Sequence, residues 1–415
     1  MKPSMIRVFL LVLSALWSPA IIAQQAWTYY NTGNSPLPEN SVRCITTAPN
    51  GTKWVGTDYG LASFDGTTWT VYTTMNSGLP DNSIRSLLAE GTNVWVGTFF
   101  GGLAKFDGSS WTIYNMTNSS IPDDFVRSLA KNHSGGIWVG TIGGLALFDG
   151  LTWNTYNMTN TPLLSNNISA LWSDSISTMV GTINGGLGFL SGGSWQHFTL
   201  LNSNLPDNSC LGLVRDVAGT PWMATPANGL SAYVGGIQFL TLSTSTSGIA
   251  SNSTTCIAYH APSDEIWMGS LDAGLIRKNG LNFFAYGTSN GSLPDNVIQC
   301  VHVDPQGIVW AGMQSGGLVR LDPNLLNSVA WIDDQNQTLA YPNPAVDKIN
   351  FDLSFFEGGV LEIHDLQGRQ LHQEPLASGF QTHSAVISHL ATGKYHATVR
   401  ENDGKVRRFG FVKAP

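Results

Sequence analysis

The sequence contains little charge and few cysteines. Charged residues make up 12% of its 415 residues, against roughly 25% in an average soluble protein. Four cysteines are too few and too scattered for a disulfide framework, and they are Cys44, Cys210, Cys256 and Cys300. Residues 24–339 contain ten Lys and Arg against twenty Asp and Glu, with no basic stripe. This balance argues against nucleic acid or an anionic membrane surface as a partner.

The sequence also lacks the common catalytic motifs. It has no HExxH, no G-x-S-x-G and no glycine-rich loop between a strand and a helix. His260 and His302, with Asp304 as the only obvious third ligand, would make an incomplete metal site. We therefore predict no catalytic residue, no metal site and no cofactor.

Long apolar runs are missing except at the N-terminus. Residues 1–23 have a basic start, an apolar run from Val8 to Trp17 and a small-residue ending, as a secretory signal peptide does. The apolar run is too short to span a membrane stably, although a membrane anchor is the alternative. No Cys follows it, so a lipoprotein is not expected. We expect an exported protein with no transmembrane span.

Glycine and tryptophan are abundant, at 45 and 14 residues, and they mark a repeat. A first series of tryptophans has a constant spacing of 42 residues and comprises Trp27, Trp69, Trp111, Trp153 and Trp195. A second landmark, Trp-Val-Gly-Thr or a variant of it, begins at Trp54, Trp95, Trp138, Met179, Trp222, Trp267 and Trp310. A turn like Leu-Pro-Asp-Asn precedes most of these landmarks, and Gly-Leu-x-x-Phe-Asp-Gly follows the first three. The chain therefore contains seven copies of one unit.

Each unit is predicted to form four short strands. In the first unit these are Val42–Thr46, Lys53–Thr57, Leu61–Phe64 and Trp69–Tyr72, with a hairpin turn at Asp65-Gly66. Four-stranded units of roughly 40–45 residues are typical of β-propeller blades. The alternative, a linear solenoid, would need polar capping repeats, and none is visible. We predict an all-β fold, a seven-bladed β-propeller of four-stranded blades over residues 24–323.

The seventh unit lacks its own fourth strand. Its three inner strands are expected near Ile298–Val303, Ile308–Gly312 and Leu318–Leu321, and the pattern then breaks at Pro323. The spare N-terminal strand Trp27–Tyr30 matches the missing one and would close the ring. Ser328–Ile332 is the competing candidate.

The sequence pattern of these repeats resembles that of the two-component-regulator propeller family. The resemblance covers about residues 25–323 and is specific in units one to three and seven. In that family the propeller often forms the periplasmic sensor of a membrane histidine kinase. This chain has neither a spanning helix nor a kinase, so the resemblance implies the fold and not signalling.

Residues 340–415 differ from the propeller region in composition and sequence pattern. After a polar linker, 324–339, they contain five of the nine histidines and no blade landmark. Their short alternating strands, expected at Val360–Asp365, Ala385–Ile387, Tyr395–Arg400 and Arg408–Val412, suit a small β-sandwich. An immunoglobulin-like adhesion module is one possible identity for such a sandwich.

This module is similar to the type A sorting domain of type IX secretion. The similarity lies in four segments, which are Tyr341–Pro344, Leu361–Arg369, Leu390–Tyr395 and Arg408–Lys413. It implies type IX secretion machinery as a partner and removal of the tail after passage across the outer membrane. It also implies a secreted, extracellular or outer-membrane surface-attached location.

The loops between the second and third strands vary while their flanks stay constant, so they are the expected ligand-binding face. Exposed aromatics beside amides and acids suit a glycan or protein ligand. The candidates are Tyr59, Phe99, Phe100, Asn184, Asn228, Asp272 and Gln314. The alternative is that the aromatic rings pack locally under the loops.

Three arginines recur at one repeat position at the expected channel mouth. Arg43, Arg85 and Arg127 follow acidic turn residues of the same units, which are Glu39, Asp81 and Asp123. They predict either an anion site or a girdle of ion pairs between blades. We predict a non-catalytic binding or scaffold protein. The alternatives are an extracellular polysaccharide lyase or hydrolase on the same scaffold, and a soluble accessory sensor.

Overall fold

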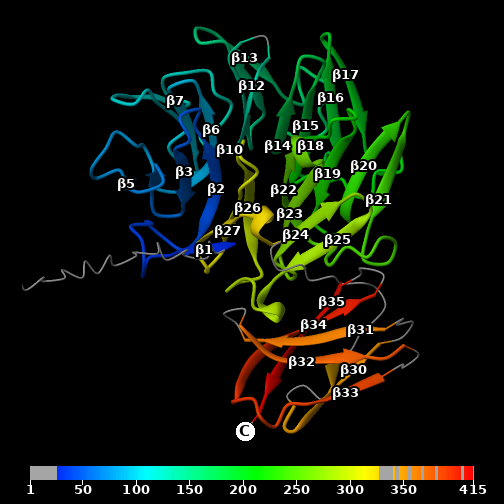
Figure 1. Cartoon of the computed structure of the whole chain (residues 1–415). Coiled ribbons are helices and arrows are strands. Elements are labelled where there is room, and N and C mark those ends of the chain that lie inside the picture. Colours follow the sequence, from blue (N-terminus) through cyan, green and yellow to red (C-terminus); the bar gives the residue numbers. More distant parts are fainter. Residues whose placement is uncertain are drawn as a thin grey trace, which may run out of the picture. The chain divides into compact units, whose positions relative to one another are not determined.

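The computed structural model describes residues 26–133, 135–326, 340–341, 345–353, 358–365, 369–378, 382–402 and 406–414. The predicted signal peptide, most of the linker and the candidate strand Ser328–Ile332 lie outside these ranges. The chain divides into two compact units, Met1–Pro323 and Asn324–Pro415, which are coloured blue to yellow and orange to red in Figure 1.

The described residues of the first unit form seven four-stranded antiparallel sheets. Six of them take their strands in chain order, from the inner to the outer edge. They are β2 (Val42–Thr47), β3 (Lys53–Thr57), β4 (Leu61–Phe64), β5 (Trp69–Tyr72); β6 (Ile84–Glu90), β7 (Asn93–Thr98), β8 (Leu103–Phe106), β9 (Trp111–Tyr114); β10 (Val126–Lys131), β11 (Ile137–Thr141), β12 (Leu145–Phe148), β13 (Trp153–Tyr156); β14 (Ile168–Ser173), β15 (Thr178–Thr182), β16 (Leu187–Ser191), β17 (Ser194–Phe198); β18 (Gly212–Arg215), β19 (Pro221–Thr225), β20 (Gly229–Gly235), β21 (Gln238–Leu242); β22 (Thr254–His260), β23 (Glu265–Ser270), β24 (Leu275–Asn279), β25 (Asn282–Tyr286).

The seventh sheet combines the two ends of this unit. β26 (Ile298–Val303), β27 (Val309–Met313) and β28 (Leu318–Leu321) are followed by the short helix α1 (Pro323–Leu326). β1 (Trp27–Tyr30) pairs antiparallel with β28, so it is the outer strand of this sheet. Two 3₁₀ turns, η1 (Ala261–Ser263) and η2 (Thr288–Asn290), complete the elements of this unit.

The hairpin turn of each early unit depends on its Asp-Gly pair. The Asp65 carboxylate accepts hydrogen bonds from the backbone N–H groups of Thr67 (2.8 Å) and Thr68 (2.7 Å). Gly66 has φ +105°, a conformation that favours glycine. Because Asp107 and Asp149 bind their turns in the same way, this series is structural, as expected of a residue that recurs in each unit.

The core lies between neighbouring sheets. The Trp54 ring stacks on Tyr72 of its own sheet and meets Phe106 of the next sheet edge-on, with centroids 5.5 and 5.9 Å away. Trp95 meets Phe148 of the third sheet in the same way. Aromatic pairs of this geometry stabilise a core beyond the area that they bury. The landmark tryptophans therefore join consecutive sheets.

The seventh sheet packs against the first. β26 contacts β2, and the two strands lie side by side in Figure 1. Tyr30 of β1 contacts Trp310 of its own sheet and both Phe64 and Trp69 of the first sheet. The buried pair Lys53 and Asp304 joins the same two sheets, with Nζ and Oδ2 3.1 Å apart.

The second unit contains two sheets with a core of their own. One has the order β29-β30-β33, from β29 (Ala340–Tyr341), β30 (Lys348–Asp352) and β33 (Thr382–Val386). The other has the order β32-β31-β34-β35, from β31 (Gly359–His364), β32 (Gln370–Leu376), β34 (Gly393–Glu401) and β35 (Val406–Lys413). The sequence did not predict β30 and β32. Phe351, Leu361 and Tyr395 are among the side chains that pack between the strands.

Candidate ligand-binding face

The loops after the second strands and the residues that enter the first strands share one end of each sheet. The backbone N–H of Phe99 donates to the carbonyl of Ser83, at 3.0 Å, and Gln314 donates to Val297 at the same distance. Ile183 and Leu271 make the equivalent bonds in their sheets. We call this end, with its loops and the first residues of the inner strands, the loop face.

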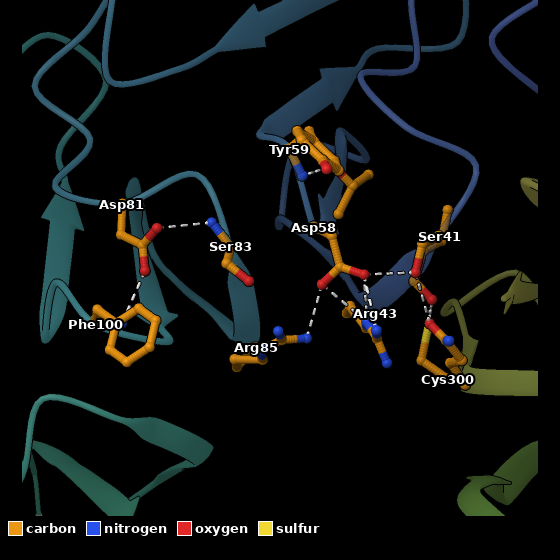
Figure 2. Close-up of polar contacts among 12 residues, drawn as sticks. Ser41, Arg43, Asp58, Tyr59, Asp81, Ser83, Arg85, Phe100 and Cys300 are labelled. Atoms are coloured by element: carbon orange, nitrogen blue, oxygen red, sulfur yellow. Dashed lines mark hydrogen bonds and ion pairs between the residues drawn. The ribbon is translucent and has the colours of Figure 1, made fainter.

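Two of the predicted aromatic residues are freely accessible on the loop face. The side chain of Tyr59 is 65% exposed and that of Phe100 is 75% exposed. Figure 2 shows how their loops are fixed: the N–H of Phe100 donates to Asp81 (2.8 Å), and the N–H of Tyr59 donates to the Thr57 hydroxyl (3.1 Å). Rings held on fixed backbone lose little conformational freedom when a ligand binds.

Phe99 behaves differently, because it packs locally as the alternative interpretation stated. Its ring meets those of Phe100 and Phe125 edge-on, with centroids 4.2 and 4.4 Å away. Phe125, on the loop that enters β10, was not among the predicted site residues. It is aromatic where the first two units have Ser41 and Ser83, and this exchange was the available signal.

The four polar candidates come from separate sheets and differ in their hydrogen bonds and exposure. Asn184 has φ +63° and accepts a hydrogen bond from the Ser209 hydroxyl (3.3 Å). Asn228 donates to the carbonyl of Pro206 (3.1 Å), so its amide holds a neighbouring loop. Asp272 and Gln314 are exposed. The structure thus places all four on the loop face without bringing them together with the aromatic residues.

Two of the three arginines are ion-paired, but not to the expected acids. Asp58 accepts hydrogen bonds from Arg43 (Nη2 to Oδ2, 2.8 Å) and lies 2.9 Å from Arg85 of the second sheet (Nη1 to Oδ1). The Ser41 hydroxyl also donates to this carboxylate at 2.7 Å (Figure 2). Burial would raise the pKa of Asp58, but these hydrogen bonds and the two positive charges outweigh burial and hold it below its usual range.

Glu39, Asp81 and Asp123 do not pair with the arginines. Their carboxylates instead accept hydrogen bonds from backbone N–H groups of the loops, those of Asn40, Ser83 and Phe125 respectively. Sequence reasoning missed Asp58 because it stands on the variable loop after β3, fifteen residues from Arg43. The feature of the sequence that could have identified Asp58 is the acid at the tip of this loop in the first unit.

Arg127 has an amide partner instead of a carboxylate. Its Nη1 donates to the Asn167 side-chain oxygen of the fourth sheet at 2.9 Å. Burial, together with the charge of Arg85, lowers the pKa of Arg127. Among the described residues no carboxylate lies within ion-pairing distance of it.

All three arginines occupy β-bulges. The pairing of β2 with β3 skips from Val42 to Cys44, so Arg43 is the extra residue. The same shift leaves Arg85 and Arg127 unpaired in their ladders. A bulge redirects one side chain relative to the regular pleat, and bulges are common next to functional sites.

The three residues considered as metal ligands, His260, His302 and Asp304, each have another partner. His302 contacts the Thr47 hydroxyl (2.8 Å), and burial lowers its pKa to about 4. Asp304 pairs with Lys53, while His260 bonds Ser263. Burial raises the pKa of Cys44 to about 12 and that of Cys256 to about 11. In the described part of the chain no three His, Cys, Asp or Glu side chains gather as a metal site would require.

The repeated sheets define a β-propeller, and comparisons with known proteins identify both parts of the chain. Residues 339–412 match the family "Secretion system C-terminal sorting domain", and residues 292–315 match "Two component regulator propeller". Both predicted resemblances are confirmed, in the predicted order. No curated protein matched the sequence.

Several solved structures share the fold. The extracellular domain of BT3049 from B. thetaiotaomicron, described as a hybrid two component system, has 17% identity and a TM-score of 0.63 over 94% of this chain and 57% of that one. PorZ, an essential bacterial surface component of the type IX secretion system of Porphyromonas gingivalis, has 14% identity and a TM-score of 0.55 over 91% and 60%. Virginiamycin B lyase from Staphylococcus aureus has 15% identity and a TM-score of 0.57 over 71% and 98%.

These likenesses confirm the all-β propeller fold and leave its chemistry open, because the identities are low. The chain spans about three fifths of the length of the first two of these structures. Because residues 339–412 match a secretion-system sorting domain, it is a secreted or cell-surface propeller protein. Within the described ranges no helix has the length and apolar character needed to cross a membrane.

Proposed function

We propose that this secreted propeller is a non-catalytic binding protein whose ligand is a glycan that contacts the loop face. The observation that supports it is the exposure of the Tyr59 and Phe100 rings on loops fixed by hydrogen bonds. The flat C–H faces of sugar rings stack well on such aromatics, and their hydroxyls suit nearby amides and acids. The tail supplies the export that a surface receptor for glycans requires.

The state of two acids on this face, Asp58 and Asp295, supports binding over general-acid catalysis. A general acid needs a raised pKa to keep its proton near neutral pH. Hydrogen bonds outweigh burial at both Asp58 and Asp295, and hold their pKa values below the usual range. These carboxylates therefore stay ionised and serve the structure of the loops.

A glycan array probed with the full chain and two variants tests the proposal. Phe100→Ala and Tyr59→Ala should each weaken selective binding on the order of tenfold, because each removes a stacking surface of roughly 1.4 kcal/mol. Leu151→Ala, which trims a side chain that is 91% exposed in the turn between β12 and β13, is the matched control and should bind normally.

Two results would contradict the proposed function. Glycan binding that is unchanged in both aromatic variants would show that the ligand does not contact the loop face. Release of shortened sugars from a bound glycan would make the protein a polysaccharide lyase or hydrolase.

A further inference from the structure

We propose that the loop face contains an anion site between Arg85 and Arg127 that binds the carboxylate of an acidic sugar. This inference rests on the proposed function and names its ligand class, a glycan that contains uronic acid. The site comprises the two arginines and the ring pair Phe99 and Phe125.

Among the described residues, the arginines at this place outnumber the carboxylates that pair with them. Three arginines project from consecutive inner strands, β2, β6 and β10, and two of them, Arg43 and Arg85, share one carboxylate, that of Asp58. Arg43 binds it through two nitrogens and Arg85 through one, while the hydrogen-bond partner of Arg127 among the described residues is the amide of Asn167. The equivalent bulge and inner-strand positions in the other four sheets are uncharged, and they hold Ser169, Leu211, Thr255 and Gln299.

The folded protein holds this charge at a cost. Burial and the neighbouring Arg85 both disfavour the charged form of Arg127, and Nε of Arg85 is buried without a hydrogen-bond partner among the described residues. A structural arginine usually has its charge compensated by the fold. An anion supplied by a ligand would compensate it here.

Two aromatic rings hold the arginines in place. The guanidinium carbon of Arg85 lies 4.9 Å from the Phe99 ring centroid, and that of Arg127 lies 5.6 Å from the Phe125 centroid. Because the two rings contact each other, the cations lie on one continuous aromatic support. Guanidinium groups fixed in this way suit the planar, forked geometry of a carboxylate.

The anion site adjoins the exposed aromatic surface. Phe100, which is 75% exposed, meets Phe99 with centroids 4.2 Å apart. One sugar ring could therefore stack on Phe100 while its carboxylate reaches the arginines. An acidic sugar can use both features of this place, because its ring stacks on an aromatic side chain and its carboxylate pairs with a cation. The carboxylate side chains of an acidic peptide would use the cation alone. The combination therefore favours an acidic sugar over an acidic peptide.

The first test measures stability without any ligand. If Arg127 serves ligand binding, Arg127→Gln removes a buried positive charge and its repulsion with Arg85, so the Tm of the full chain rises. Arg43→Gln, at the same repeat position but held by Asp58, should lower the Tm. Arg320→Gln, on β28 and away from this cluster, removes a long ion pair with Asp322 (Nη2 to Oδ2, 3.9 Å) and should lower the Tm only slightly. A lower Tm for Arg127→Gln would mark a structural arginine and overturn the proposal.

The second test uses tetragalacturonate, its methyl ester and polyglutamate as probes in calorimetric titrations. We expect tetragalacturonate to bind, its uncharged ester to bind at least about tenfold more weakly, and Arg127→Gln to abolish that preference. Arg320→Gln should retain the preference for tetragalacturonate over its ester. Added salt should reduce this preference only in proteins that keep Arg127.

The outcomes separate this inference from the proposed function. Equal binding of tetragalacturonate and its ester, still lost in Phe100→Ala, would overturn the anion site and leave the glycan receptor standing. Equal binding of polyglutamate would replace the acidic sugar with an acidic polypeptide. No binding of tetragalacturonate would also overturn the acidic-sugar assignment.

Discussion

At the scale of the residue, one carboxylate decides how the loop face is charged. Asp58 is shared by arginines from two sheets, so it both neutralises charge and joins the sheets. Arg127 stands at the same repeat position and has no such partner among the described residues. Identical residues at equivalent repeat positions thus differ in role, because among the three sheets that carry these arginines only the variable loop of the first supplies an acid.

The Asp58→Asn variant should lose both stability and part of its acid sensitivity. At pH 7 we expect a loss of about 2 kcal/mol, since hydrogen bonds to charged groups of this kind are removed and two arginines lose their counter-ion. The folded-state pKa of Asp58 lies below its ordinary value of about 3.9. Its contribution is therefore complete above that value and disappears as the pH falls through the folded-state pKa.

Urea unfolding between pH 7 and pH 3 measures this effect. The difference between wild type and Asp58→Asn should be constant down to about pH 5 and shrink below it. Asp272→Asn, at an exposed position on the same face, should track the wild type throughout. A difference that grows towards pH 3 would contradict the assigned role of Asp58.

At the scale of the element, the second strand of six of the seven sheets has a glycine where it meets its neighbours, and the fifth sheet has Ala224 there. A Cβ on Gly56 would lie 2.5 Å from the sulfur of Cys44, and one on Gly312 would lie 2.5 Å from that of Cys300. In the second and third sheets serine takes the place of cysteine, at Ser86 and Ser128. The inner strands therefore require a small side chain at this position, and cysteine and serine both meet that requirement.

The Gly97→Ala variant should destabilise the fold strongly. The added methyl group would collide with the Ser86 hydroxyl and lie 2.8 Å from the backbone oxygen of Val126 in the next sheet. Since that backbone cannot move without its sheet, we expect a loss of about 3 kcal/mol, measured by urea unfolding.

Gly108→Ala is the matched control for this strand position. Gly108 has φ +101° in an open hairpin turn, with nothing within 4 Å of a new Cβ. Its substitution should cost only the backbone strain, about 1 kcal/mol. Equal losses at the two positions would show that close packing between sheets is not what requires glycine at Gly97.

At the scale of the whole molecule, the two ends of the chain serve different purposes. The N-terminal strand β1 completes the last sheet of the propeller, while the C-terminal residues form a unit with a separate core. The core of that unit is drawn from its own strands, so its folding does not require residues of the propeller sheets.

Deletion of residues 340–415 should block export and spare the fold of the propeller. In a bacterium with type IX secretion, we expect the full chain outside the outer membrane and the truncated chain in the periplasm. Immunoblots of cell fractions give the location, and resistance of the truncated chain to protease gives its folding. Surface delivery of the truncated chain would mean that the tail is not the export signal.

The repeat made most of the fold predictable. The first-unit strands Lys53–Thr57 and Leu61–Phe64 have the predicted bounds, and Val42–Thr46 extends by one residue. Periodic landmarks allow each weak strand signal to be read several times over. The tail offers one copy of each strand, so β30 and β32 were missed.

The candidate site was predictable in position and only partly in detail. Tyr59 and Phe100 are exposed on the loop face as the loop tips indicated, whereas Phe99 is packed beside Phe125. The repeat position of the arginines was visible in the sequence. Their partners were not, because Asp58 reaches Arg85 from another sheet.

The sequence by itself determined what local spacing can carry: the repeated strands, the turns at Asp-Gly pairs, the address at the C-terminus and the loops that vary. Only the tertiary structure decided which residues from different repeats meet. Neighbouring sheets bring Asp58 to Arg85 and Phe99 to Phe125, and they leave Arg127 with an amide. Such contacts depend on packing between units that are about forty residues apart in the chain, and no local pattern records that packing.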